Sequence, residues 1–181
     1  NEHFPLLAKA RAISERLRYP DGRVVAIHDT WAQHDKGPAT AATAPDLLPA
    51  YGHARLGTGR GDDQIQAHLH FSGGYGHQHD DLLSMTLFAR GAERLSDVGY
   101  THTRYRVWTL STLSHNTVMV DGREQAAGSS RRPNDGALQL YVPNEDDLQI
   151  AEASAPRAYP GITSEYRRML ILVEIEPGRT Y

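Results

Sequence analysis

The first apolar pattern along the chain has the period of an α-helix. Four apolar residues follow one another at spacings of four, three and four: Leu6, Ala10, Ile13 and Leu17. This spacing predicts a helix over residues 5–18 with one apolar face. Pro20-Asp21-Gly22 then ends the helix. From residue 23 to about residue 49 the pattern is irregular, and no chemistry is predicted there.

Beyond Gly61 the period of the apolar residues changes to two. Apolar side chains alternate with polar ones, as in a strand with one buried face. The apolar positions are Ile65, Ala67, Leu69 and Phe71. His68 and His70 fall on the polar face between them and are predicted to be ordinary surface residues. A glycine-rich turn is predicted at residues 72–76.

Short strand-like segments fill most of the remaining chain, with polar turns between them. They lie at residues 82–90, 93–98, 116–120, 138–142, 148–153 and 166–175. Several short strands and a single helix predict an all-β fold, either an antiparallel β-sandwich or an open barrel, preceded by one short helix.

Composition limits the possible functions. The 181 residues are 39% hydrophobic, enough for one folded domain but not for two large ones. The formal charge is −3 and there is no long basic run, which argues against a nucleic-acid partner. No apolar stretch approaches the roughly 20 residues of a membrane span. Because cysteine is absent, a metal would have to be bound by histidine and carboxylate.

Histidine is concentrated in one part of the chain. Six of the ten histidines lie within 48 residues: His68, His70, His77, His79, His102 and His115. His77 and His79 are two residues apart and would face the same side of an extended backbone. Asp97 is 18 residues from both His79 and His115, as three ligands from three strands of one sheet could be. Two imidazoles and a carboxylate suit Zn2+, and iron or manganese could also bind.

A simpler interpretation of these residues stays open. A His-x-His pair on a strand can be two solvated imidazoles, and an aspartate before Val-Gly can be a turn residue. The loop 99–108 also has two interpretations. Arg104 and Arg106 offer forked donors for an anion, and the Tyr105 hydroxyl could move a proton beside a cation. Alternatively the loop is packed and hydrogen-bonded, and His102 within it has no assigned role.

Four motifs together resemble the β-domain of heparinase II/III-type polysaccharide lyases. The resemblance covers about residues 23–181 and is densest over residues 74–125. The motifs are Gly76-His77-Gln78-His79-Asp80-Asp81-Leu82-Leu83-Ser84, Phe88-Ala89-Arg90-Gly91, Ser96-Asp97-Val98-Gly99-Tyr100, and Ser114-His115-Asn116-Thr117-Val118-Met119-Val120-Asp121-Gly122.

The resemblance implies a domain organisation. Family members join an α/α toroid to an antiparallel β-sandwich, and the polysaccharide lies in the cleft between them. Residues 1–22 would then be the end of the toroid or a linker. Residues 23–181 would be a β-sandwich that is incomplete at its C-terminus. The toroid of the same full-length chain would be a partner of this domain.

The resemblance also implies roles for individual residues. It makes His79, Asp97 and His115 the ligands of a structural Zn2+. His77 and Tyr105 would be catalytic, Tyr105 being preferred to Tyr100 because it lies in the Arg-Tyr pair before a Trp. The residues expected to bind substrate are Arg104, Tyr100 and Asn116.

The activity that the resemblance implies is β-elimination on a polysaccharide that contains uronic acid, such as alginate or a heparin-type chain. Other catalytic groups would come from the toroid, so the 181 residues alone are not expected to turn over substrate. The family also implies a periplasmic or secreted location. Two alternatives remain open at this stage: a cupin-like metal-dependent oxygenase, and a carbohydrate-binding β-sandwich without catalysis.

Overall fold

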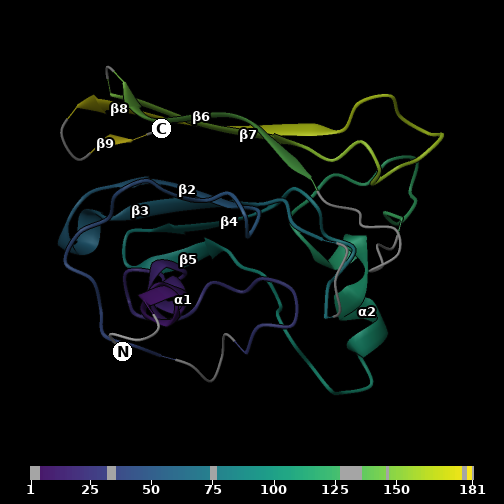
Figure 1. Ribbon diagram of the computed structural model, residues 1–181, viewed down its shortest axis with the longest axis horizontal. Helices are drawn as coiled ribbons and strands as arrows, with labels where there is room; N and C mark the ends of the chain where they lie inside the picture. Colours follow the sequence, from purple (N-terminus) through teal and green to yellow (C-terminus); the bar gives the residue numbers. More distant parts are fainter. Residues whose placement is uncertain are drawn as a thin grey trace.

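Two antiparallel sheets lie face to face in this computed structural model (Figure 1). The structure describes residues 5–31, 36–73, 77–126, 136–145, 147–176 and 179–180. The first sheet has the order β1-β2-β3-β4-β5 and the second β6-β7-β8-β9. This arrangement confirms the predicted all-β antiparallel sandwich and excludes the open barrel.

The strands of the first sheet are β1 (Asp46–Leu48), β2 (His53–Thr58), β3 (Ile65–His70), β4 (Ser84–Ala89) and β5 (Ala92–Leu95). Those of the second sheet are β6 (Ala137–Glu145), β7 (Leu148–Ser154), β8 (Arg167–Glu176) and β9 (Arg179–Thr180). The helical elements are α1 (Pro5–Arg16), η1 (Gly61–Asp63), α2 (Arg106–Leu110) and η2 (Thr112–Ser114).

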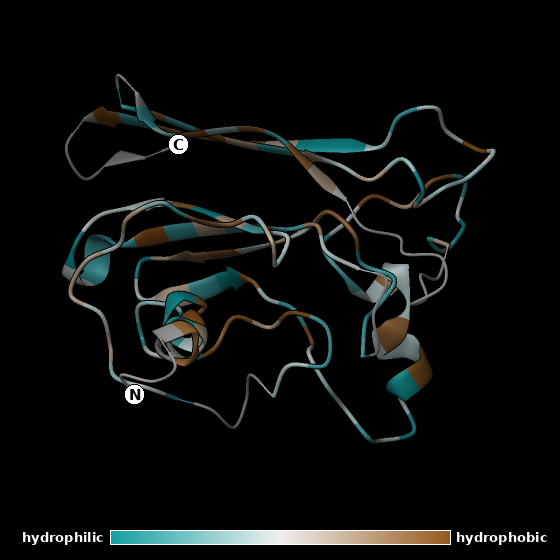
Figure 2. Ribbon diagram, in the orientation of Figure 1, coloured by the Kyte–Doolittle hydropathy of each residue, from teal (hydrophilic) through white to brown (hydrophobic). Residues whose placement is uncertain are grey.

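The larger hydrophobic core fills the space between the two sheets. Alternate residues of β2 and β3 point into it, among them Leu56 and Leu69, which are fully buried. The second sheet meets them with Ala151 and Ala153. Small side chains on β7 let the sheets approach closely, and Figure 2 shows apolar stretches in strands of both sheets. The alternation predicted for residues 65–71 is therefore confirmed for its apolar half.

A smaller core lies on the opposite face of the first sheet. It contains Leu17, Tyr19, Val25 and Ile27, which follow α1 and pack against Leu48 and Phe88. Figure 1 shows α1 on this side of the sheet, away from β6, β7 and β8. Both faces of the first sheet are thus covered, one by the second sheet and one by the N-terminal segment.

This cover makes one prediction from the sequence wrong. His68 and His70 are only 2% and 5% exposed, so they are not surface residues. The polar face of β3 meets the segment after α1 instead of water. Buried polar groups need partners, and these two imidazoles find them in other side chains. His68 lies 3.0 Å from Gln66 Oε1, and His70 lies 2.9 Å from His28 Nε2.

Most of the other predicted elements are present within a few residues of their expected bounds. The predicted strand at residues 116–120 is wrong, since only Val120 forms an isolated bridge there. Strands β1 and β2 and the short helix α2 were not predicted, so the expectation of a single helix is also wrong. The predicted turn at residues 72–76 lies partly outside the described residues.

The β4–β5 hairpin turns at Arg90-Gly91, where both residues have positive φ, 51° and 69°. This is the conformation of a two-residue type I′ turn, which matches the twist of the strands it joins. Among the described residues, none of the helices has the length and apolar character that crossing a membrane requires.

Candidate metal centre and substrate-facing surface

Three loops at one end of the first sheet bring the predicted metal ligands together. His79 precedes β4, Asp97 follows β5 and His115 follows η2, and all three side chains are buried. Each offers one ligand atom within 4.8 Å of the other two. The predicted grouping is therefore present. The ligands stand on connecting loops, however, and not on three strands as the sequence spacing suggested.

The distances between these groups fit a small cation. His115 Nδ1 lies 2.8 Å from Asp97 Oδ2, and one ligand atom from each of His79, Asp97 and His115 lies within 4.8 Å of the other two. Ligand atoms around tetrahedral Zn2+ are about 3.4 Å apart, as follows from bonds of 2.0–2.2 Å. Two imidazole nitrogens and one carboxylate oxygen are also a donor set that zinc accepts. The residues present thus fit the metal that the sequence suggested.

Hydrogen bonds and burial act differently on the pKa values of His115 and His79. The Thr109 carbonyl can only accept, so His115 Nε2, 3.0 Å away, donates to it. Burial alone would lower the pKa of His115, but the hydrogen bond to Asp97 and the nearby carboxylate charges outweigh it, and the pKa is raised. For His79 burial dominates, and its pKa is lowered.

A fourth group, Asp29, was not predicted from the sequence. Its carboxylate accepts hydrogen bonds from His79 Nε2 at 2.9 Å, His77 Nδ1 at 3.0 Å and Arg106 Nη2 at 2.6 Å. Burial alone would raise the pKa of Asp29, yet these three donors lower it, so the group is a carboxylate at neutral pH. The only sequence signal is a His-Asp pair within the segment predicted to carry no chemistry.

The sequence suggested that Arg106 offers its guanidinium to a bound anion, but the structure pairs this guanidinium with Asp29. Its guanidinium forms an ion pair with both oxygens of Asp29, with Nη1 at 2.5 Å from Oδ1. It also lies 4.9 Å from the centroid of the Tyr100 ring. Such a two-pronged pair fixes the guanidinium plane. In this structure Arg106 therefore holds the Asp29 carboxylate in place.

His77 lies at the solvent edge of the same cluster. Its side chain is 84% exposed, while Nδ1 contacts Asp29 Oδ2. The backbone at His77 has φ 69° and is not extended. Both histidines of the His-x-His pair therefore contact Asp29. The left-handed backbone at His77, and not the alternation of a strand, brings them to the same side. The two imidazoles differ in burial: His79 lies buried beside Asp97 and His115, whereas His77 faces solvent.

The aromatic loop after Asp97 leads into α2. Tyr105 is 55% exposed, and its hydroxyl lies 2.7 Å from Arg104 Nη2. Tyr100 packs instead against Trp31, with ring centroids 4.5 Å apart. Asn116 donates from Nδ2 to the Ser96 carbonyl at 2.7 Å.

A surface pocket of about 550 Å³ opens beside Tyr105. Its walls are formed by Thr101, Thr103, Tyr105, Trp108 and Thr109. The hydroxyl groups of such side chains can contact the polar edges of a sugar ring, and their aromatic faces can pack on its apolar face.

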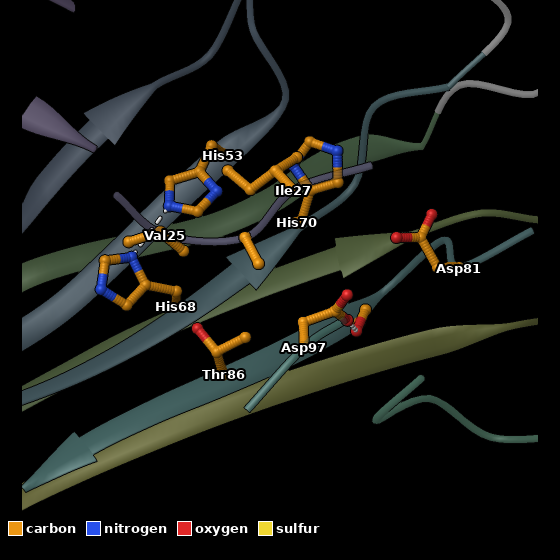
Figure 3. A pocket seen from close by; sticks show the side chains of 10 residues that line it. Val25, Ile27, His53, His68, His70, Asp81, Thr86 and Asp97 are labelled. Atoms are coloured by element: carbon orange, nitrogen blue, oxygen red, sulfur yellow. Dashed lines mark hydrogen bonds between the residues drawn. The ribbon is translucent and has the colours of Figure 1, made fainter. Parts of the chain in front are cut away.

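Beside Asp97 a layer of polar side chains continues into the protein (Figure 3). His28 Nδ1 lies 3.0 Å from Asp81 Oδ1, and the two groups are almost fully buried. Burial would raise the pKa of Asp81, but the charge of His28 and its hydrogen bond lower it strongly. Further along, His53 Nε2 lies 3.0 Å from His68 Nδ1. A cavity of about 10 Å³, near the size of one water molecule, lies among these groups.

Comparisons with known proteins agree on one group of relatives. The sequence matches the family described as heparinase II/III-like, C-terminal, over residues 44–175. An alginate lyase of Stenotrophomonas maltophilia (strain K279a) is 29% identical over 103 residues, which are 49% of this chain and 14% of that lyase. An exo-oligoalginate lyase of Saccharophagus degradans is 27% identical over 137 residues, or 67% of this chain and 18% of that enzyme.

The fold has solved counterparts. The crystal structure of the heparan sulfate lyase HepC from Pedobacter heparinus superposes with a TM-score of 0.69 at 16% identity. The superposition covers 91% of this chain and 30% of that one. The match to each of the two curated relatives spans less than a fifth of the relative's length.

Proposed function

Because this chain belongs to the heparinase II/III-like family, matching its C-terminal domain over residues 44–175, we propose that it is the β-domain of a polysaccharide lyase. The substrate is an anionic polysaccharide that contains uronic acid. Alginate is the first candidate, since both curated relatives are named for it. Such a polymer is met outside the cytoplasm, so we also propose a periplasmic or secreted location.

One observation carries this proposal. An exposed imidazole, that of His77, stands beside a buried set of metal-ligand residues, and the same loops present Tyr105 and its pocket. A carbohydrate-binding domain without catalysis would not need a buried cluster that orients an exposed histidine. The convergence of these groups from separate motifs favours a reacting surface.

The reaction requires removal of a weakly acidic proton. A base takes the C5 proton of the uronate, the electron pair of that bond forms the C4–C5 double bond, and the C4–O bond breaks. The leaving oxygen then receives a proton. A carboxylate at C5 opposes this step while it keeps its full charge, so hydrogen-bond donors must stabilise the charge that develops there.

The exposed residues can serve these needs. We assign His77 and Tyr105 to proton transfer, since both side chains are accessible and carry groups that accept and donate protons. Arg104 Nη2 donates to the Tyr105 hydroxyl oxygen at 2.7 Å, which holds that hydroxyl beside a cation. Arg104, Tyr100 and Asn116 are assigned to substrate binding.

Zn2+ is the ion that we propose for His79, Asp97 and His115. When bound, it contributes charge and rigidity to the loops that carry the ligands. The three residues come from three separate loops, so an ion held by them ties the ends of β4 and β5 to η2. His77 is not among its ligands. Its role is the outward-facing one described above.

The test is a lyase assay of the full-length protein, which includes the proposed toroid domain, and of its variants. The unsaturated product absorbs in the ultraviolet, and alginate and heparan sulfate are compared as substrates. His77→Ala and Tyr105→Phe are each expected to lower kcat by about 10²- to 10⁴-fold, the usual size of a lost proton-transfer group. Tyr100→Phe separates the two tyrosines, because it should mainly raise KM.

His102→Ala is the matched control, since His102 is an exposed histidine of the same loop region with no role in the proposal. Its activity should equal that of the unchanged protein. Retained binding with lost turnover in the His77 variant supports catalysis. Turnover that survives in both the His77 and Tyr105 variants would show that this surface binds sugar without reacting. The 181 residues alone are expected to bind without turnover.

A further inference from the structure

We propose that Asp29 is a positioning residue that orients the metal ligand His79 and the substrate-facing His77 at the same time. The inference rests on the proposed metal site and deepens it. It assigns the contact between that site and the exposed surface to one carboxylate, which lies outside every motif on which the family resemblance was based.

The two oxygens of Asp29 are used in parallel. Oδ1 lies 2.9 Å from His79 Nε2 and 2.5 Å from Arg106 Nη1. Oδ2 lies 3.0 Å from His77 Nδ1 and 2.6 Å from Arg106 Nη2. Each oxygen is therefore shared between one imidazole and one nitrogen of the same guanidinium. The Asp29 side chain is 6% exposed, so little water competes for these contacts.

These contacts fix which nitrogen of each ring carries a proton. A carboxylate only accepts, so His79 donates from Nε2, and its Nδ1 is left with the lone pair that faces His115. Carboxylates hold metal-binding histidines in this way and orient the ring for the ion. His77 donates from Nδ1 by the same logic, which leaves Nε2 as the ring nitrogen not engaged by Asp29.

The backbone holds Asp29 in this place. Its N–H donates to the His77 carbonyl at 3.2 Å, and the Thr30 carbonyl next to it accepts from Tyr100 N at 3.1 Å. Gly99 approaches so closely that a Cβ there would lie 2.6 Å from the Thr30 oxygen. The loop of Asp29 is thus tied both to the His77 motif and to the chain after Asp97. A shift of the carboxylate would move both histidines.

The first experiment compares Asp29→Asn with the unchanged protein. The amide keeps the shape of the side chain but loses the charge and one acceptor oxygen. We expect the affinity for Zn2+, measured by competition with a chromophoric chelator, to fall about 10- to 100-fold. In protein loaded with Co2+ the visible absorption bands should change, because the ligand geometry changes. In the same variant kcat should fall as well, because His77 loses the acceptor that orients its ring.

Asp21→Asn is the matched control. Asp21 precedes Asp29 in the same segment and also pairs with an arginine, Arg23, at 2.7 Å. It does not contact the site, so the metal affinity, the Co2+ spectrum and kcat of this variant should be those of the unchanged protein. A wild-type Zn2+ affinity in Asp29→Asn would overturn the inference. The proposed metal site itself fails only if His79→Ala and His115→Ala also bind zinc normally.

A second measurement uses the unchanged protein and does not depend on the folding of a variant. Nitrogen-15 NMR of the zinc-loaded protein reports the protonated nitrogen of each histidine ring. His79 should be protonated at Nε2, and His77 should carry a proton on Nδ1. The His77→Ala spectrum assigns the signals. A His79 ring protonated at Nδ1 would contradict the role given to Asp29.

Discussion

At the scale of single residues, His115 is the proposed ligand whose ring orientation is fixed by contacts on both nitrogens. Its Nδ1 lies 2.8 Å from Asp97 and its Nε2 lies 3.0 Å from the Thr109 carbonyl. A ring engaged on both nitrogens has one orientation, and this orientation already aims Nδ1 at the second ligand. Metal binding at such a site needs little rearrangement, so the free energy of binding adds to the stability of the fold.

Removal of the metal should therefore lower the melting temperature of the unchanged protein. A ligand present at 100 times its Kd stabilises by about 2.7 kcal/mol, and a chelator removes this contribution. In His115→Ala the melting temperature and the zinc content should both be low, and the chelator should have no further effect. Thermal unfolding and metal analysis of the same samples check this.

His77→Ala serves as the comparison, because His77 is exposed and is not among the three proposed ligands. It should keep its zinc and its response to the chelator. An unchanged melting temperature of the wild-type protein after chelation would remove the support for a structural ion.

The sequence predicted the grouping of the three candidate ligands but not the carboxylate beside them. His79, Asp97 and His115 lie within continuous motifs, and their spacing can be recognised. Asp29 precedes His79 by 50 residues and stands in a segment without periodicity. Only the folded chain brings the two side chains within 2.9 Å. A contact of this kind depends on how a cover segment packs, which local patterns do not encode.

At the scale of secondary-structure elements, Gln149 joins the two sheets. It lies on β7 and is 6% exposed. Its side chain accepts from Gly57 N at 2.8 Å and donates to Gly57 O at 3.1 Å, both in β2. The amide thus satisfies two backbone groups of the opposite sheet in the interior, where each would be costly without a partner.

Gln149→Ala should lower the free energy of unfolding by about 2–4 kcal/mol, since it leaves a buried N–H and a buried C=O without partners. Urea denaturation measures the effect. Gln139→Ala is the control, because Gln139 is exposed on β6 and the loss should stay within about 0.5 kcal/mol. An equal decrease in the free energy of unfolding in both variants would mean that the hydrogen bonds to Gly57 do not stabilise the fold.

Strands were predicted correctly where the alternation of apolar and polar residues reflects packing. The prediction failed where side chains, and not a neighbouring strand, supply most of the hydrogen-bond donors. Residues 148–153 and 166–175 form strands, as their patterns predicted, and the structure pairs them with each other as β7 and β8. The segment 116–120 has a similar pattern, but side chains supply most of the donors to its carbonyls. The backbone donors are Met85 N to the Asn116 oxygen and Arg123 N to the Val120 oxygen. The Val118 oxygen accepts from Tyr159 and Tyr166, and the Asn116 oxygen accepts from Arg168. Helix α2 spans five residues, too few to show a helical period.

At the scale of the whole molecule, the first sheet carries buried imidazoles on the face turned toward the N-terminal segment. Burial lowers the pKa of His53 to about 3 and lowers the pKa values of His68 and His70 well below the usual range. These rings are therefore neutral in the folded protein. The sequence suggested a solvated face, because alternation shows which positions share a face but not what covers it.

The protein should become less stable in mild acid for this reason. Unfolded histidines have pKa values near 6.5, so between pH 6.5 and about 3 the unfolded chain binds more protons than the folded one. Each buried histidine then removes up to about 1.4 kcal/mol per pH unit as the pH falls. His79, whose pKa is lowered, acts in the same direction as these three, whereas His115 and Asp80, whose pKa values are raised, act in the opposite direction.

Urea denaturation at pH 7 and pH 5 tests this dependence. His53→Gln should be less stable than the unchanged protein at pH 7, yet it should lose less stability between the two pH values, because one of the three groups is gone. His102→Ala, which removes an exposed histidine, should keep the wild-type slope. Parallel slopes for all three proteins would show that His53 is protonated in the folded state.

The segment over the polar face of the first sheet also decides where this domain can be trimmed. The family match begins at residue 44, but Leu17, Tyr19, Val25 and Ile27 already belong to the packed interior. A protein shortened to residue 44 would leave the imidazole face of the first sheet open to water and would lack Asp29. Recombinant versions of the β-domain therefore have to start at or before Leu17.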